Sequence, residues 1–116
     1  MGFLTTHVLD TASGRPAAGV LIELFRVDSD RCHLGNSVTN EDGRCGEPLL
    51  SESDFQVGEY ELIFHAGDYF AATGLSQQEP RFLDRVVIRF GVSDASQHYH
   101  VPLLISPFSY STYRGS

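Results

Sequence analysis

The chain has 116 residues, 41% of them hydrophobic and 20% charged, with a net charge of −7. This length and composition are typical of one globular domain with one core, so we expect residues 1–116 to form a single domain. The acidic balance argues against nucleic acid and anionic membranes as partners, because both select basic surfaces. In addition, no apolar run approaches the roughly 20 residues that cross a bilayer.

The two cysteines and the N-terminus bear on where the protein works. The first residues lack the basic and then apolar pattern of a secretory signal. Small secreted domains usually carry several disulfides, whereas this chain has only Cys32 and Cys45. We therefore expect both cysteines to be reduced in a cytoplasmic protein.

Short runs in which apolar and polar residues alternate predict β-strands. In chain order, strands are expected over residues 4–10, 19–27, 33–39, 60–65 and 86–92, with a further extended run after residue 98. Clusters of Gly, Pro, Asn and Asp at 11–16 and 40–43 predict turns between them. Short strands separated by such turns indicate an all-β sandwich. The exception is residues 68–77, which predict one short helix with Asp68 as its N-cap.

The most informative run is His98-Tyr99-His100, close to the C-terminus. A strand places residues two apart on the same face, so both imidazoles are expected to project together while Tyr99 points the other way. Paired histidines suit proton transfer or metal binding. Pro102 cannot donate to a sheet ladder, so this run should form an edge, a bulge or a pocket wall. From these residues alone, a solvent-facing edge strand explains the pair equally well.

Other residues could join this pair. The terminal Tyr113-Arg114-Gly115-Ser116 combines a phenol, a guanidinium and a carboxylate, whereas His7 and Arg44 taken singly are typical surface residues. His33 and His65 have no chemical neighbour in the sequence and are interpreted as structural.

Metal binding is the main alternative for the histidines. His7, His98 and His100 would make a three-histidine set of the kind found in catalytic zinc sites. No further ligand stands at a suitable spacing, so the residues permit zinc without requiring it. A phosphate-binding loop, a nucleophile elbow and a dinucleotide-binding glycine motif are all absent from the sequence.

Five stretches together resemble a known family, the transthyretin-like 5-hydroxyisourate hydrolases of purine catabolism. They are THVLD at 6–10, TNEDGR at 39–44, FHAGDYF at 64–70, HYHVPLL at 98–104 and STYRGS at 111–116. The resemblance covers essentially the whole chain, and the terminal Tyr-Arg-Gly-Ser is specific to the enzyme branch. Hormone-carrying transthyretins share the stretch at 106–112 but lack the two histidines and this ending.

The resemblance implies a β-sandwich of two four-stranded sheets with one short helix. It also implies a homotetramer, in which dimers joined edge to edge pair face to face around a central channel that holds the active sites. Such pairing would cover free strand edges, which are otherwise an association hazard.

The resemblance further implies hydrolysis of 5-hydroxyisourate to 2-oxo-4-hydroxy-4-carboxy-5-ureidoimidazoline by direct attack of water, with no metal or other cofactor. His7 and His100 would transfer protons and Arg44 would stabilise the oxyanion. The implied substrate-binding residues are His98, Ser111, Tyr113, Arg114, Gly115 and Ser116. The alternative is a non-catalytic carrier of small aromatic ligands, but a carrier channel should hold few titratable groups.

Overall fold

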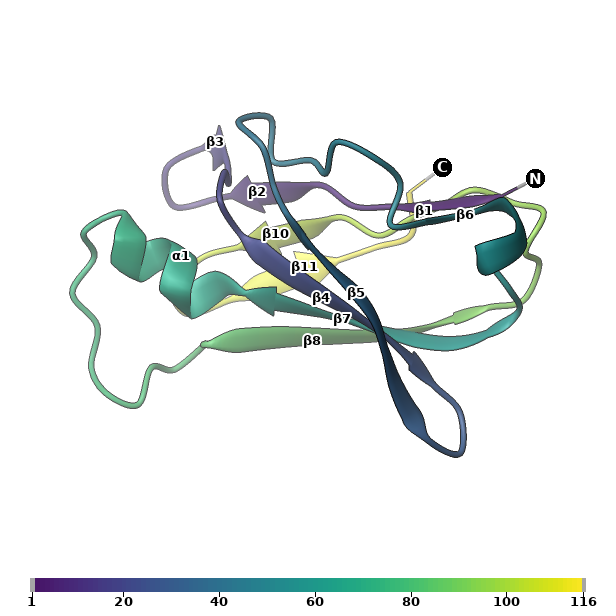
Figure 1. The fold of residues 1–116 in the computed structure, drawn as a ribbon. Helices are drawn as coiled ribbons and strands as arrows, with labels where there is room; N and C mark the ends of the chain where they lie inside the picture. The colour runs from purple at the N-terminus through teal and green to yellow at the C-terminus, as the bar shows by residue number, and fades with distance from the viewer. Residues whose placement is uncertain (1, 116) are drawn as a thin grey trace.

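Two layers of β-strands face each other in the computed structural model, which describes residues 2–115 (Figure 1). The first layer is one antiparallel sheet with the strand order β5-β4-β7-β8. Its strands are β5 (Arg31–Val38), β4 (Leu21–Val27), β7 (Gly58–His65) and β8 (Arg85–Val92). The expected all-β sandwich with one short helix is therefore confirmed.

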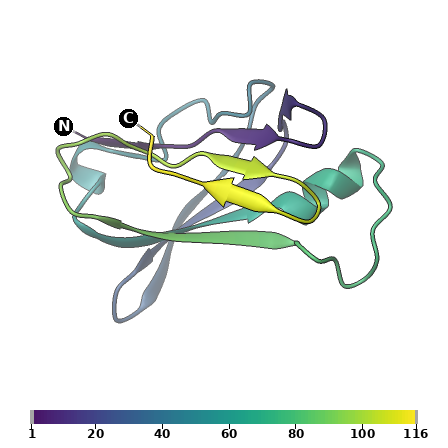
Figure 2. The same ribbon diagram turned by 180° about the vertical axis from the view of Figure 1, so that it is seen from behind.

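The second layer differs from the single four-stranded sheet that the resemblance implies, because it is divided into a three-stranded and a four-stranded sheet. One has the order β6-β1-β9, with β6 (Leu50–Ser51), β1 (Phe3–Thr5) and β9 (Tyr99–His100). The other has the order β11-β10-β2-β3, with β11 (Tyr110–Thr112), β10 (Leu103–Ile105), β2 (Val8–Asp10) and β3 (Arg15–Pro16). A 3-10 helix, η1 (Glu52–Asp54), follows β6. Figure 2 shows this layer from the side on which β10 and β11 lie in front.

The run expected as one strand over 4–10 is divided into β1 and β2 by a break at Thr6 and His7. A matching break at Val101 and Pro102 separates β9 from β10. Pro102 has no N–H to donate, and the Thr6 hydroxyl donates to the Val101 carbonyl across the break at 2.7 Å. Because Leu103 N–H still donates to His7 O at 2.8 Å, the two halves continue as one layer.

The core lies between the two layers and follows the predicted alternation. In β8, Val86, Ile88 and Val92 are buried, while Val87 and Arg89 are exposed. Among the described residues, every buried side-chain nitrogen or oxygen has a hydrogen-bond partner. No described helix has both the length and the apolar character that crossing a bilayer requires.

The helix begins earlier and ends earlier than the sequence predicts, because α1 spans Ala66–Ala72. The expectation that Asp68 is the N-cap is wrong, since His65 occupies that position without a side-chain capping bond and Asp68 lies in the first turn. Gly67 N–H donates instead to the Asp84 carbonyl at 2.8 Å. Gly74, at φ +94°, ends the helix one turn after Phe70.

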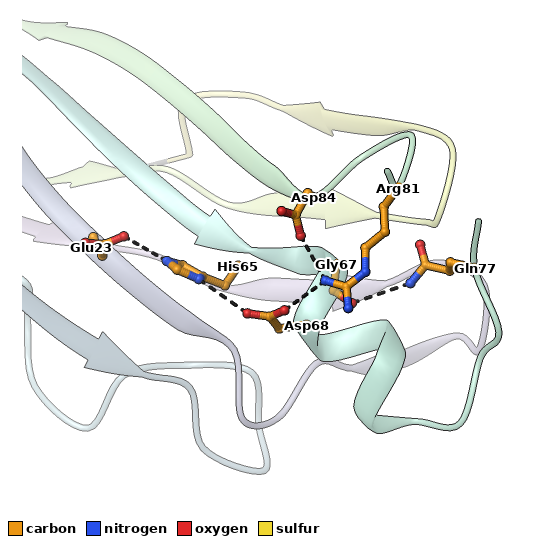
Figure 3. Close-up of polar contacts among 7 residues, drawn as sticks. All are labelled: Glu23, His65, Gly67, Asp68, Gln77, Arg81 and Asp84. Carbon is orange, nitrogen blue, oxygen red and sulfur yellow. Dashed lines mark hydrogen bonds and ion pairs between the residues drawn. The ribbon is translucent and has the colours of Figure 1, made fainter. Parts of the chain in front are cut away.

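A polar network anchors the start of this helix (Figure 3). His65 is buried, with Nε2 2.8 Å from a Glu23 carboxylate oxygen and Nδ1 3.6 Å from Asp68. Arg81 donates to Asp68 at 2.8 Å and to Asp84 at 2.9 Å. The network ties β7 to β4 and fastens the loop after α1 onto the helix, in agreement with a structural reading of His65.

This network predicts a specific dependence of stability on pH. The hydrogen bond from Arg81 holds the pKa of Asp68 below its ordinary value of 3.8. Charged Asp68 therefore stabilises the fold above that pH, and its contribution is lost as the pH falls through the lowered pKa. Because the carboxylate is largely exposed, Asp68→Asn should lower the free energy of unfolding near neutral pH by only about 0.5–1 kcal/mol.

Thermal unfolding of the Asp68→Asn variant should show a loss of roughly 2–4 °C in Tm near neutral pH. The difference from the wild-type protein should close as the pH drops below 3.8. Glu59→Gln is the control, because it removes an ion pair with Arg89 in which both side chains are at least half exposed. A Tm difference for Asp68→Asn that stays constant with pH would contradict the electrostatic origin.

Candidate active site

Thr5, His98 and His100 meet on the outer face of the second layer. The parallel pairing of β1 with β9 sets Thr5 beside His100. The Thr5 hydroxyl lies 2.8 Å from His98 Nε2 and 2.9 Å from His100 Nδ1, and the two imidazole centroids are 6.4 Å apart. Tyr99 is buried on the opposite face. The predicted shared face of the two histidines is therefore confirmed.

His7 and Arg44 are brought together by the predicted turn at 40–43. Asn40 Oδ1 accepts the N–H groups of Asp42 at 2.9 Å and Arg44 at 3.2 Å, which closes the turn. Gly43 has φ +74°, and a Cβ there would lie 2.3 Å from the Val8 carbonyl oxygen. Only glycine allows the turn to dock so closely on β2. As a result, Arg44 forms an antiparallel bridge with His7.

The environment of His100 favours a neutral imidazole. His100 is half-buried, and this burial is the largest cause of its lowered pKa. The positive charge of Arg44 lowers the pKa further, followed by smaller contributions from His98 and His7. Arg44, His98 and His7 therefore all lie within electrostatic reach of His100. A neutral imidazole near neutral pH can accept a proton, which is what a general base must do.

The segment after β11 contacts the same strand through its backbone. Gly115 N–H donates to the His100 carbonyl at 2.7 Å, and a Cβ on Gly115 would lie 2.7 Å from His100 Cδ2. Arg114 lies 3.9 Å over the Tyr99 ring and donates to the Gln97 side chain at 2.9 Å. Arg114 therefore packs against the residue that points away from the two imidazoles.

The structure separates the predicted site residues into two groups. His7, Arg44, His98, His100 and Gly115 are brought together as described above. The side chains of Ser111, Tyr113 and Arg114 make no hydrogen bond to an imidazole among the described residues. Ser111 pairs with Leu104 in the β10-β11 ladder, and Tyr113 is 60% exposed. Ser116 lies outside the described residues.

Thr5 is the site residue that the sequence patterns did not single out. It stands two positions before His7 on an alternating strand, which is the one signal available in the sequence. Its position between two imidazoles depends on a parallel pairing across more than ninety residues, because its partners are 93 and 95 positions away.

The geometry also bears on the zinc alternative. No group of three or more His, Cys, Asp or Glu side chains in the described part of the chain is placed to hold a metal ion. His98 Nε2 and His100 Nδ1 both point to the Thr5 hydroxyl, so these two nitrogens are engaged within the protein. The arrangement suits transfer of protons by paired imidazoles beside a fixed positive charge.

Comparison with known proteins places this arrangement in context. The model of the HIUase/Transthyretin family matches residues 4–115. A Pseudomonas aeruginosa protein named 5-hydroxyisourate hydrolase is 58% identical over 117 residues, covering 100% of this chain and 93% of the relative.

Solved structures agree with these sequence matches. A crystal structure of (S)-allantoin synthase has a TM-score of 0.94 and 49% identity, but the match spans 99% of this chain and only 44% of that one. Klebsiella pneumoniae 5-hydroxyisourate hydrolase has a TM-score of 0.81 and 38% identity, covering 98% of this chain and 99% of that one. Sea bream transthyretin in complex with thyroxine has a TM-score of 0.85 and 27% identity, covering 97% and 93%.

The close approach of Gly115 to His100 generates a prediction. In Gly115→Ala, the new methyl group would overlap His100 Cδ2, and we expect the imidazole to move because its ring is the part that is closest. The ¹H and ¹⁵N resonances of the His100 ring should shift strongly, while the free energy of unfolding changes by less than about 0.5 kcal/mol. Gly46→Ala is the control, since nothing lies within 4 Å of a Cβ at that position. Unchanged His100 resonances in Gly115→Ala would show that the backbone, not the ring, relaxes.

Proposed function

We propose that this chain, which belongs to the HIUase/Transthyretin family, hydrolyses 5-hydroxyisourate to 2-oxo-4-hydroxy-4-carboxy-5-ureidoimidazoline in urate degradation. The observation that carries this proposal is the cluster of His7, Arg44, His98 and His100 in a chain 58% identical to a hydrolase of that name. The family model and the named relatives cover essentially the whole chain, so the match includes every element that builds the cluster.

The reaction sets three chemical requirements, and the cluster can meet each of them. Opening a cyclic amide needs an activated water, stabilisation of a tetrahedral oxyanion and a proton for the departing nitrogen. His7 and His100 would act as the proton-transfer pair, which typically contributes about 10²–10⁴-fold in rate. Arg44 would face the developing negative charge, where a fixed cation stabilises the transition state more than the ground state.

Substrate binding would involve His98 and the residues that end the chain. We propose that Ser111, Tyr113 and Gly115 hold the flat ring, whereas Arg114 supports this segment from the opposite face through its contact with Tyr99. Support comes from the contact of Gly115 with His100 and from the exposed phenol of Tyr113. No metal or other cofactor is needed for this chemistry.

A carrier of small aromatic ligands is the competing function, because a structurally similar transthyretin was solved with thyroxine. The titratable cluster argues against this function, since a carrier gains nothing from a half-buried imidazole held neutral beside a guanidinium. A carrier would bind 5-hydroxyisourate or its analogues without accelerating their decay.

We also propose that the protein is a homotetramer of single-domain subunits. In the first sheet β8 is an edge strand that pairs regularly with β7, whereas the other edge strand, β5, has a bulge opposite β4. A regular exposed edge is the better template for pairing with a second copy. Exposed rings at Phe82 and Phe108, with centroids 5.9 Å apart, supply an apolar surface for further association. The free thiols of Cys32 and Cys45 fit a cytoplasmic location.

Direct measurement of turnover tests the function. Purified protein should accelerate the decay of freshly generated 5-hydroxyisourate, and His7→Ala and His100→Ala should each lower kcat by roughly 10²-fold or more. His33→Ala is the matched control, because His33 is exposed on β5 and its imidazole bonds the Asn36 side chain, in the other layer from the cluster. Binding without acceleration would favour the carrier, and near wild-type kcat in both active-site variants would remove the acid–base assignment.

Light scattering tests the assembly. The particle should have a mass near four times 12.8 kDa. Val87→Lys should yield smaller particles, because it places like charges against each other across a symmetric β8 edge. Val57→Lys, at a similarly exposed loop position, should leave the mass unchanged. A monomeric wild-type protein with full activity would exclude a site that needs a shared channel.

A further inference from the structure

The hydroxyl of Thr5 is shared by two imidazoles. Its oxygen lies 2.8 Å from His98 Nε2 and 2.9 Å from His100 Nδ1, and both distances are within hydrogen-bonding range. A threonine hydroxyl carries one proton and can also accept. It can therefore donate to one imidazole while it accepts an N–H from the other, and such an arrangement couples the two rings.

Two such arrangements exist, and they differ in what His100 can do. When His100 Nδ1–H donates to Thr5 and Thr5 donates to His98, a neutral His100 has a bare Nε2 that can accept a proton. When His98 Nε2–H donates to Thr5 and Thr5 donates to His100, a neutral His100 carries its proton on Nε2 and can donate it. The direction of the Thr5 hydroxyl therefore selects between the base and the acid form of His100.

The surrounding backbone holds the three groups in place. Thr5 and His100 are register partners in the parallel β1-β9 pair, and the Val101 N–H donates to the Thr5 carbonyl at 2.9 Å. The Phe3 ring packs edge-on against His98 with centroids 5.8 Å apart. Gly115 closes on the other side of His100. The hydroxyl bridge is thus part of a fixed arrangement built from both ends of the chain.

We propose that Thr5 is a positioning residue that relays a proton between His100 and His98 during hydrolysis, an inference that rests on the function proposed above. When water attacks, its proton goes to His100 Nε2. The Nδ1 proton of His100 passes to the Thr5 oxygen, and the Thr5 proton passes to His98 Nε2. His100 stays neutral and His98 becomes the imidazolium. When the C–N bond breaks, His7 gives its proton to the departing nitrogen and takes up the Nε2 proton of His100. The relay then reverses and returns a proton to His100 Nδ1.

The relay has a physical reason in the burial and charge around the two rings. His100 is half-buried and faces the positive charge of Arg44, so an imidazolium is disfavoured there. His98 is exposed to solvent, where a positive charge is stabilised by water. The relay transfers the positive charge from His100 through Thr5 to His98. His100 can therefore accept a proton and later donate one without becoming an imidazolium near Arg44.

Kinetics of two Thr5 variants test the relay. Thr5→Val keeps the shape but removes the hydroxyl, and we expect kcat to fall by roughly 10-fold with little change in KM, a part of the effect that general acid–base catalysis supplies. Thr5→Ser should restore most of the loss. Thr11→Val is the matched control, because its hydroxyl donates to the Ile105 carbonyl at 3.0 Å in the turn that follows β2, away from the imidazoles. His98→Ala should match Thr5→Val, and the double variant should lose no more than either single one.

A readout that needs no turnover separates this proposal from the proposed function. In ¹⁵N spectra of the imidazoles, protonation of His98 should move the proton of neutral His100 from Nδ1 to Nε2 in the wild-type protein and in Thr5→Ser. In Thr5→Val only the charge of His98 acts through space, so this tautomer change should be absent. If the wild-type protein does not hydrolyse 5-hydroxyisourate but this coupling between the imidazoles is observed, the proposed function is wrong and the coupling through Thr5 is confirmed. If Thr5→Val does not fold, the comparison of Thr5→Ser with His98→Ala still tests the relay. Thr5→Ser should keep most of the activity, and His98→Ala should lose roughly 10-fold in kcat.

Three results would overturn the relay. One is full kcat in Thr5→Val alongside an active wild-type protein, and another is independent titration of the two imidazoles. The third is a loss of about 10⁴-fold or more in Thr5→Val together with a trapped acyl-enzyme, which would make Thr5 a nucleophile instead.

Discussion

The arrangement on which the rest of the site depends is the parallel pairing between the two ends of the chain. β1 and β2 near the N-terminus pair with β9 and β10 near the C-terminus, and both partners are interrupted at the same level. The interruption frees His7 for its bridge with Arg44 and leaves Thr5 in register with His100. Parallel pairing of such distant segments is entropically demanding, so the apolar core between the layers must stabilise it.

Two electrostatic requirements of the site conflict with each other. The oxyanion needs a nearby cation, whereas the base must be an imidazole that stays neutral. Arg44 is useful to an oxyanion because it carries a permanent positive charge within electrostatic reach of His100. The same charge, together with burial, lowers the pKa of His100 and disfavours a protonated ring there. The exposed His98, connected through Thr5, offers a place for the positive charge outside this conflict. A base that stays neutral and a nearby cation can therefore coexist.

The polar network that stabilises the fold and the imidazole cluster of the candidate site lie in different layers of the sandwich. The Glu23-His65-Asp68 network sits on β4, β7 and the start of α1, in the other layer from the imidazole cluster. Its ion pairs respond to acid through carboxylates whose pKa values are lowered by hydrogen bonds. The site instead responds through His100, whose pKa is lowered chiefly by burial, so the two parts of the molecule respond to acid through different groups.

The sequence by itself determined the all-β class, the turn at 40–43 and the shared face of His98 and His100. These depend on local alternation, or on residues whose backbone preferences are strong, such as Gly43. Through its resemblance to a family, it also indicated the candidate residues and the reaction. The sequence placed the helix within a few residues but misassigned its cap, because the Gly67 N–H is satisfied by Asp84 from a later loop.

Only the tertiary structure decided which of those residues meet. Arg114 has the charge expected of a substrate ligand, yet it packs on Tyr99. Thr5 carries no motif, yet it binds both imidazoles because β1 and β9 are parallel in one register. A register between strands more than ninety positions apart leaves no periodic trace in the sequence, since it arises from the packing of the whole core.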